Sequence, residues 1–224
     1  DKLLDMARIG ELAPILFIDR QARRNAPAWF SGRSGKEYRS TLGSKPVGAI
    51  VSMGHEEAYR WKDSVQSPNE YKLFFHDAIA NGSRPWFTKF NGKIIDKRWL
   101  DPVADVYDWC WKNEQYLRND AALAQVAMVY SQQTLHHYAG DVRDKYDDHL
   151  SGFYEALIES RTPFEMVHDR QLEPANIDRY KVLLLPNIAA LSDRQCEQLT
   201  SYVERGGSIV ATFETSLYDE WGTP

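Results

Sequence analysis

Short apolar runs alternate with amphipathic segments along this chain. In the first 90 residues, three apolar runs predict buried strands, at 14–18, 46–52 and 85–90. The segments between them predict helices, at 36–42 and from Pro68 to about Asn81. Buried strands separated by helices are typical of a parallel α/β sheet, and three such turns in succession fit the last turns of a (β/α)8 barrel.

The second half repeats this alternation with different spacing. A helix is predicted over 102–117, and Asn119-Asp120 marks a domain boundary. Four apolar runs then predict parallel strands, at 126–130, 164–167, 182–185 and 209–213. Their connecting helices are expected to start at caps Asp148 and Ser192, and the Gly206-Gly207 pair ends the last helix.

These patterns predict an α/β protein of two domains. Residues 1–119 form the C-terminal part of a barrel, and residues 120–224 form an open parallel sheet of flavodoxin-like or class I glutamine-amidotransferase-like type. The first domain lacks its early strands and the second ends abruptly, so the sequence is interpreted as a piece of a larger protein.

Composition narrows the classes of partner. The net charge of −5 offers no electrostatic basis for binding nucleic acid or an anionic membrane, and no apolar stretch is long enough to span a bilayer. Cys110 and Cys196 form neither a metal-ligand nor a CxxC pattern, so no metal is expected, and a reducing, cytoplasmic compartment is favoured. No GxGxxG or GxSxG motif occurs, and no cofactor is expected. Most of the seven Trp and twelve Tyr are expected in the core, but aromatic-rich clefts also suit sugar rings.

Three segments carry a family resemblance: VAMVYSQ, DHLSGFYEALIESRTPFEMVHD and YKVLLLPNIAALSDRQCEQLTSYVERGGSIVATFETSLYDE. They resemble the trimerisation domain of family 42 β-galactosidases, and the strand–LPN–LSD–helix–GG–strand order is the specific part. The whole chain resembles glycosyl-hydrolase-like proteins related to that family, in which a (β/α)8 barrel precedes this domain. The resemblance implies that the strands at 14–18, 46–52 and 85–90 are barrel strands six, seven and eight. It also implies a homotrimer.

The strand-end rule for barrels selects the candidate catalytic residues, because side chains just beyond the strands face the active site. Retaining glycosidases use two carboxylates, an acid/base and a nucleophile. The resemblance implies a nucleophilic Glu after strand seven, where Glu56 and Glu57 lie, and an acid/base residue outside this chain. The alternative for Glu56 and Glu57 is an exposed acidic pair in a loop.

The same rule selects the candidate substrate-binding residues Asp19, Arg20, His55 and Lys89. Trp61 lies near these strand ends in the sequence and is a candidate for stacking on a sugar. The alternatives are an ion pair between Asp19 and a nearby arginine, and an edge charge for Lys89. His55 beside two glutamates is too weak a pattern for a metal site.

The second domain carries no recognisable catalytic motif. The segment after its first strand, SQQTLHHYAGDVRDKYDD, is long, bulky and acidic, so it is unsuited to a phosphate cradle. His136 and His137 within it are expected in a solvated loop. Cys196 lies on the apolar side of a helix, near Leu199 and Val203, and is expected in the core.

The expected function is that of a glycoside-hydrolase-like protein acting on carbohydrate, with β-galactosidase-like hydrolysis of O-glycosyl bonds. The isolated chain is expected to be inactive, because a partial barrel lacks half of the site. The alternative is a non-catalytic, carbohydrate-associated oligomerisation module.

Overall fold

A computed structural model describes residues 4–19, 26–54, 64–89, 94–118, 122–139 and 144–224. The chain divides into two compact units. The first unit comprises Gly10–Asp120, and the second comprises Ala121–Pro224 together with Asp1–Ile9. The units divide after Asp120, and the residues up to Ile9 group with the second half.

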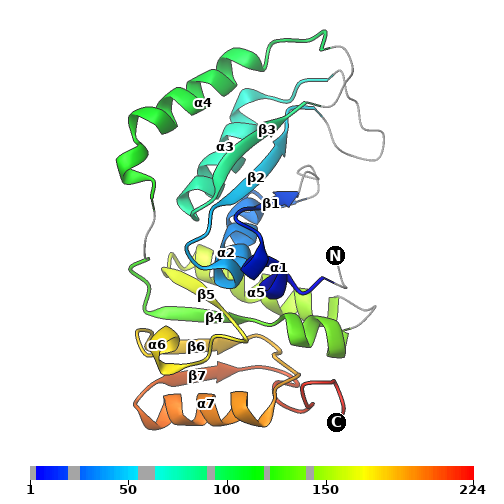
Figure 1. The fold of residues 1–224 in the computed structure, drawn as a ribbon, viewed down its shortest axis with the longest axis vertical. Helices are drawn as coiled ribbons and strands as arrows, with labels where there is room; N and C mark the ends of the chain where they lie inside the picture. The colour runs from blue at the N-terminus through cyan, green and yellow to red at the C-terminus, as the bar shows by residue number, and fades with distance from the viewer. Residues whose placement is uncertain (1–3, 20–25, 55–63, 90–93, 119–121, 140–143) are drawn as a thin grey trace. The chain divides into compact units, whose positions relative to one another are not determined.

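The first unit contains a parallel sheet of three strands in the order β1-β2-β3 (Figure 1). Its strands are β1 (Leu16–Asp19), β2 (Val47–Ser52) and β3 (Arg84–Thr88), and its helices are α2 (Phe30–Leu42), α3 (Pro68–Ala80) and α4 (Leu100–Lys112). A short 3-10 helix, η2 (Glu114–Tyr116), follows α4, and α1 (Met6–Leu12) precedes β1. The three predicted strands and their parallel pairing are confirmed.

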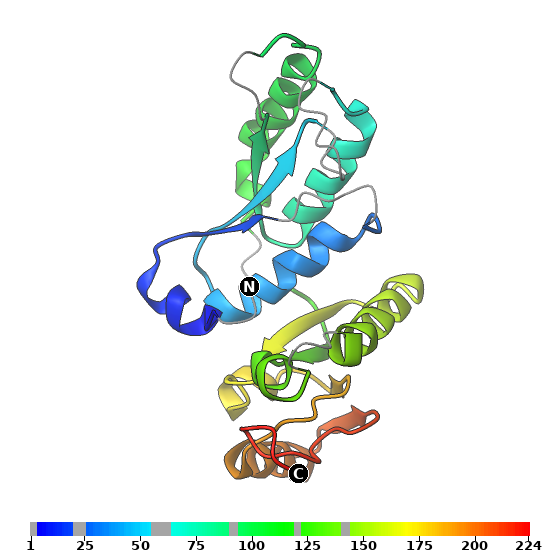
Figure 2. The ribbon, with the colours of Figure 1, turned by 90° about the vertical axis from the view of Figure 1, so that its right-hand side faces the viewer.

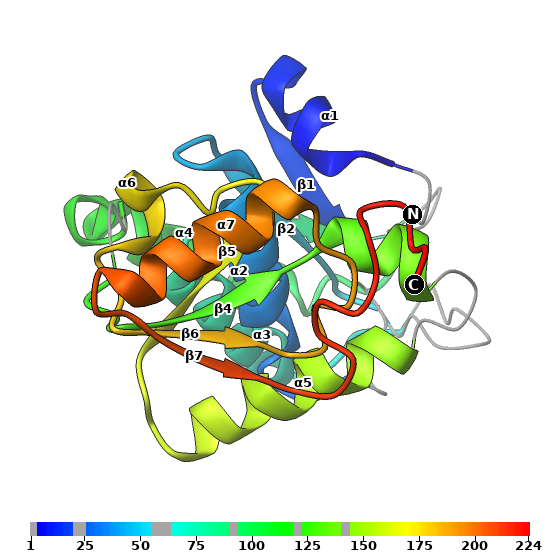
Figure 3. The same cartoon turned by 90° about the horizontal axis from the view of Figure 1, so that it is seen from below.

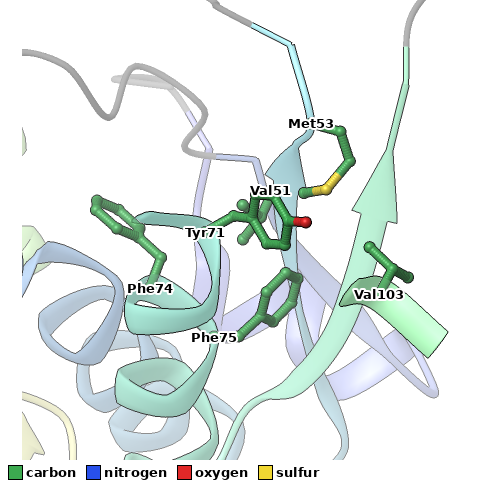
Figure 4. Packing of buried hydrophobic residues seen from close by; sticks show 6 residues of the cluster. All are labelled: Val51, Met53, Tyr71, Phe74, Phe75 and Val103. Atoms are coloured by element: carbon green, nitrogen blue, oxygen red, sulfur yellow. The ribbon is translucent and has the colours of Figure 1, made fainter. Parts of the chain in front are cut away.

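The helices of the first unit pack on one face of this sheet. Val51 and Met53 contact Tyr71 and Phe75 of α3, and Val103 of α4 joins the same buried cluster (Figure 4). Phe17 and Trp86 lie on the opposite face, where their rings meet edge to face at 4.2 Å. They remain 40% and 43% exposed. An apolar sheet face without helices is what the interior of a barrel requires.

Helix α2 begins at Phe30, six residues before the predicted start at Lys36. Its first turn contains Ser and Gly, which predict a loop, but Asp77 of α3 compensates for their low helix propensity. The Asp77 carboxylate accepts hydrogen bonds from the Gly32 N–H (2.5 Å) and the Ser31 hydroxyl (2.9 Å). A partner from another helix therefore satisfies backbone donors that the local sequence leaves unpaired. Figure 2 shows α2 and α3 side by side.

The second unit contains a four-stranded parallel sheet in the order β5-β4-β6-β7. Its strands are β4 (Val126–Tyr130), β5 (Phe164–His168), β6 (Val182–Leu185) and β7 (Ser208–Ala211). This is the flavodoxin-like order, and it confirms the predicted single parallel sheet. Helices α5 (Asp144–Glu159) and α7 (Asp193–Glu204) lie on opposite sides of the sheet (Figure 3), and α6 (Pro174–Ile177) precedes β6.

Three local predictions for the second unit are wrong. Helix α5 starts before the expected cap at Asp148. The expected solvated loop around His136 and His137 is a π-helix, η3 (Thr134–Ala139). Cys196 is only half-buried, because its stripe on α7 is incompletely covered and Val203 remains 48% exposed. The Ser192 cap is confirmed as a capping box with Gln195.

Within the described residues, no helix has both the length and the apolar character that crossing a membrane requires.

We predict opposite effects of alanine at two helical glycines. A Cβ at Gly32 would lie 2.4 Å from the Asn81 amide and 2.6 Å from the Asp77 carboxylate, so Gly32→Ala should lower the free energy of unfolding by about 1–3 kcal/mol. A Cβ at Gly152 meets nothing within 4 Å, so Gly152→Ala should raise the free energy of unfolding by about 0.5–1 kcal/mol. Urea denaturation followed by circular dichroism measures both. Equal effects would contradict the close packing of α2 on α3.

Candidate functional site

The carboxyl edge of β1, β2 and β3 carries those predicted site residues that the structure describes. Asp19 is the last residue of β1, and Lys89 directly follows β3. Both lie at the same edge because the strands are parallel. Asp19 of β1 pairs with Ile50 of β2, and Ile50 pairs with Trp86 of β3. Lys89 comes after Trp86 in the chain, so it lies further along the sheet than Asp19, with β2 between them.

Asp19 and Lys89 differ in their surroundings. The Asp19 side chain is exposed, whereas Lys89 is half-buried. The Lys89 ammonium donates a hydrogen bond to the Ser64 carbonyl oxygen at 2.8 Å. Lys89 therefore ties β3 to the segment that returns toward α3, in addition to any contact it makes with a ligand.

The turn after β2 is also held firmly. The Met53 N–H donates to the Thr88 carbonyl oxygen and the Gln66 N–H donates to the Met53 carbonyl oxygen, both at 2.9 Å. The Gln66 side-chain amide donates to the Gly54 carbonyl oxygen. These bonds hold Met53, Gly54 and Gln66 beside the end of β3.

The remaining predicted residues lie outside the described part of the chain. These are Arg20, His55, Glu56, Glu57 and Trp61.

A second polar cluster lies at the carboxyl edge of β4 and β5, within the second unit. Asp169 directly follows β5 and is 2% exposed. Its carboxylate accepts hydrogen bonds from the Ser131 hydroxyl at 2.7 Å and the Gln133 N–H at 3.0 Å. Nδ1 of His168 lies 2.7 Å from its other oxygen. The cluster joins the ends of two strands to the start of η3.

Ser131, Asp169 and His168 do not form a nucleophilic triad. In such a triad the histidine lies between the serine and the acid. Here Asp169 lies between Ser131 and His168, and the other ring nitrogen of His168 faces the Gln132 amide oxygen at 3.3 Å. The Ser131 hydroxyl donates to the Asp169 carboxylate and not to an imidazole, which is not the arrangement of a serine triad, so the cluster's role is structural.

Electrostatics support this structural role. Burial raises the pKa of Asp169, but the hydrogen bond and charge of His168, with the donors of Gln133 and Ser131, outweigh burial and hold that pKa below its ordinary value. Asp169 is therefore a carboxylate at neutral pH.

Sequence reasoning missed Ser131, Gln133, His168 and Asp169. The signal was present, because each follows or ends an apolar run predicted as a parallel strand.

Among the described residues, no group of three or more His, Cys, Asp or Glu side chains is arranged to hold a metal ion.

Two comparisons show which known proteins this sequence is similar to. Residues 124–223 match the family model of the β-galactosidase trimerisation domain. The β-galactosidase BglY of Alicyclobacillus acidocaldarius is 25% identical over 173 residues, which cover 72% of this chain and 22% of that protein.

Solved structures extend the similarity to the whole chain. A GH42 β-galactosidase from G. stearothermophilus matches with a TM-score of 0.75 and 18% identity, over 100% of this chain and 36% of that one. A β-galactosidase from Bacillus circulans sp. alkalophilus matches with a TM-score of 0.76 and 16% identity, over 98% of this chain and 35% of that one. At these identities the likeness shows the fold.

The resemblance to glycosyl-hydrolase-like proteins related to family 42 β-galactosidases is therefore confirmed, and the chain is glycoside-hydrolase-like. It spans about a fifth of the length of the curated relative and about a third of the solved structures.

We predict that Asp169→Asn lowers the free energy of unfolding by about 3 kcal/mol at pH 7, because it removes a buried charge from its partners. The folded-state pKa of Asp169 lies below its ordinary value of 3.8, so the stability it contributes is complete above that value. This contribution is lost as the pH falls through the lower folded-state pKa. The difference between variant and wild type should therefore shrink below about pH 3.8.

Thermal denaturation at pH 7 and pH 3 measures this difference. Asp148→Asn, at an exposed position on α5, is the matched control and should change stability by less than about 0.5 kcal/mol. A cost at Asp169 no larger than that of the control would contradict the structural role.

Proposed function

We propose that this chain is part of a β-galactosidase-like glycoside hydrolase that cleaves O-glycosyl bonds, with β1, β2 and β3 as the last strands of its (β/α)8 barrel. One observation carries the proposal: the sheet is parallel, with helices on one face and the apolar residues Phe17 and Trp86 on the other. Further barrel strands would complete that second face. The similarity to family 42 β-galactosidases supports the reaction class.

In this proposal the carboxyl edge of β1–β3 is one side of the active site. Glu56 or Glu57 is the nucleophile, and the acid/base residue lies outside this chain. The hydrogen bonds at Met53 and Gln66 fix the base of the segment that carries both glutamates. Retaining chemistry needs two carboxylates about 5–5.5 Å apart.

The substrate-binding residues in this proposal are Asp19, Arg20, His55, Trp61 and Lys89. The exposed carboxylate of Asp19 accepts hydrogen bonds from sugar hydroxyls, and the Lys89 ammonium donates to them from the far side of β2. Lys89 also braces the segment before α3 through Ser64.

We predict that Glu56→Gln or Glu57→Gln lowers kcat/KM for a β-galactoside by about 10³-fold or more in the full-length protein, because amide replaces the attacking carboxylate. Hydrolysis of an aryl β-galactoside measures the loss. Replacing the same glutamate by alanine leaves room for azide, which should restore turnover and form a glycosyl azide.

Glu70→Gln, in the first turn of α3, is the control and should leave kcat/KM unchanged. If both Glu56→Gln and Glu57→Gln retain wild-type activity, the nucleophile assignment fails. If the full-length wild type hydrolyses no glycoside, the proposal gives way to the non-catalytic oligomerisation module.

The second unit is proposed to assemble the full-length protein as a homotrimer. The match of residues 124–223 to a trimerisation domain supports this role. Exposed apolar side chains on and after β7 also support it: Val210 at 44%, Phe213 at 70% and Leu217 at 62%. Apolar patches of this kind mark interaction surfaces.

We predict that light scattering of the full-length protein gives three times the mass of one chain. Leu217→Glu should lower that mass, since it places a charge in the apolar patch, whereas Leu73→Glu, 54% exposed on α3, should not. A monomeric wild type at micromolar concentration would remove the assembly role.

A further inference from the structure

A cavity of about 240 Å³ lies at the carboxyl ends of β4 and β5 in the second unit. Its walls come from segments far apart in the sequence: Asp5 near the N-terminus, Gln132 and His136 around the start of η3, Arg170 after β5, and Trp221. In open parallel sheets, ligands bind beyond the carboxyl ends of the strands. The cavity is therefore positioned where such a fold holds a small molecule.

Trp221 lines this cavity, and hydrogen bonds hold the turn that contains it. The Asp219 carboxylate accepts hydrogen bonds from the backbone N–H groups of Trp221 (2.9 Å) and Thr223 (2.8 Å), which forms a tight turn. Gly222 has a φ of +81° and lies so close to the His137 carbonyl oxygen that a Cβ would come within 2.3 Å of it. A larger residue at position 222 would thus displace Trp221.

The Trp221 ring stays available to a ligand. It meets the His137 ring edge to face, with 5.6 Å between centroids, and the residue is 71% exposed. A preorganised indole face costs little entropy when a ligand stacks on it.

His136 supplies a polar group without a partner. Its Nε2 atom is buried and has no hydrogen-bond partner among the described residues. Burial, followed by the neighbouring His137, lowers the pKa of His136, so its ring is neutral at neutral pH. A buried polar atom left unpaired is costly, and a ligand hydroxyl would remove that cost. His136 also lies on the π-helix η3, and π-helices recur at functional sites.

The charges on the cavity walls argue against phosphates, other anions and metal ions as ligands. Arg170 is paired with Asp5 at 2.8 Å, so the cavity's one arginine is neutralised and does not favour a phosphate. Asp169 is satisfied by its own donors, and Glu220 adds a further negative charge that disfavours anions. No metal-ligand cluster occurs among the residues that the structure describes.

We propose that this cavity binds a single neutral sugar ring. One C–H face of the ring stacks on Trp221, and ring hydroxyls hydrogen-bond to His136, the Gln132 amide and the Glu220 carboxylate. An aromatic platform beside planar polar side chains provides both an apolar face and several hydrogen bonds in one small site. The second unit would then bind carbohydrate as well as assemble the protein.

Titration of the 224-residue chain with D-galactose and D-glucose, followed by NMR, tests this proposal. The indole N–H resonance of Trp221 should shift with a Kd of roughly 1–10 mM, as expected for one sugar ring on a partly open site. Trp221→Ala should weaken sugar binding about tenfold, since the stacking platform is lost. Trp221→Phe should retain most of the binding, and His136→Ala should weaken it severalfold.

Trp111→Ala is the matched control, because Trp111 is 77% exposed on α4 of the first unit. It should leave the titration unchanged. The proposal is overturned if the Trp221 resonance does not move at about 50 mM of either sugar. It is also overturned if Trp221→Ala and Trp111→Ala bind alike, or if only a charged amino sugar binds. The readout does not use hydrolysis, so its failure is distinct from a failure of the proposed glycosidase activity.

Discussion

The parallel pairing of the strands in both sheets determines where the polar groups at the strand ends lie. Parallel neighbours need a crossover long enough to return to the starting edge, which α2, α3, α5 and α7 provide. The same pairing collects all carboxyl ends of a sheet at one edge. Asp19 and Lys89 share one carboxyl edge, and Ser131 and Asp169 share the other, for this reason and not because of any local motif.

The two carboxyl edges differ in what stabilises them. In the first unit, backbone and amide hydrogen bonds at Met53 and Gln66 hold the base of a long segment, and the charged side chain of Asp19 stays exposed. In the second unit, the buried Asp169 carboxylate gathers the donors of Ser131 and Gln133 and thereby sets the start of η3. In the second unit the charge of Asp169 is satisfied internally, and the cluster positions His136 beside a cavity.

The strands were predictable from sequence because a strand buried on both faces needs a continuous apolar run, as at Val126–Tyr130. The start of α2 was not predictable from the local sequence, because Asp77, which is 45 residues away from Gly32 in sequence, stabilises this start. The π-helix η3 and its cavity were also missed, since Asp5 and Trp221 reach that place only through the tertiary fold. For the proposed glycosidase site, the strand-end rule selects the carboxyl edge of β1–β3 but does not by itself assign a role to Glu56 or Glu57.

The central claim is that the carboxyl edge of β1–β3 belongs to a retaining glycosidase site. The most direct test is to trap the glycosyl-enzyme of the full-length protein with a 2-deoxy-2-fluoro-β-galactoside, which slows hydrolysis of the covalent intermediate. Peptide mass spectrometry then locates the label. The account predicts one sugar on the peptide that contains Glu56 and Glu57, attached to one of these two residues. A label on a carboxylate elsewhere in the protein would contradict it.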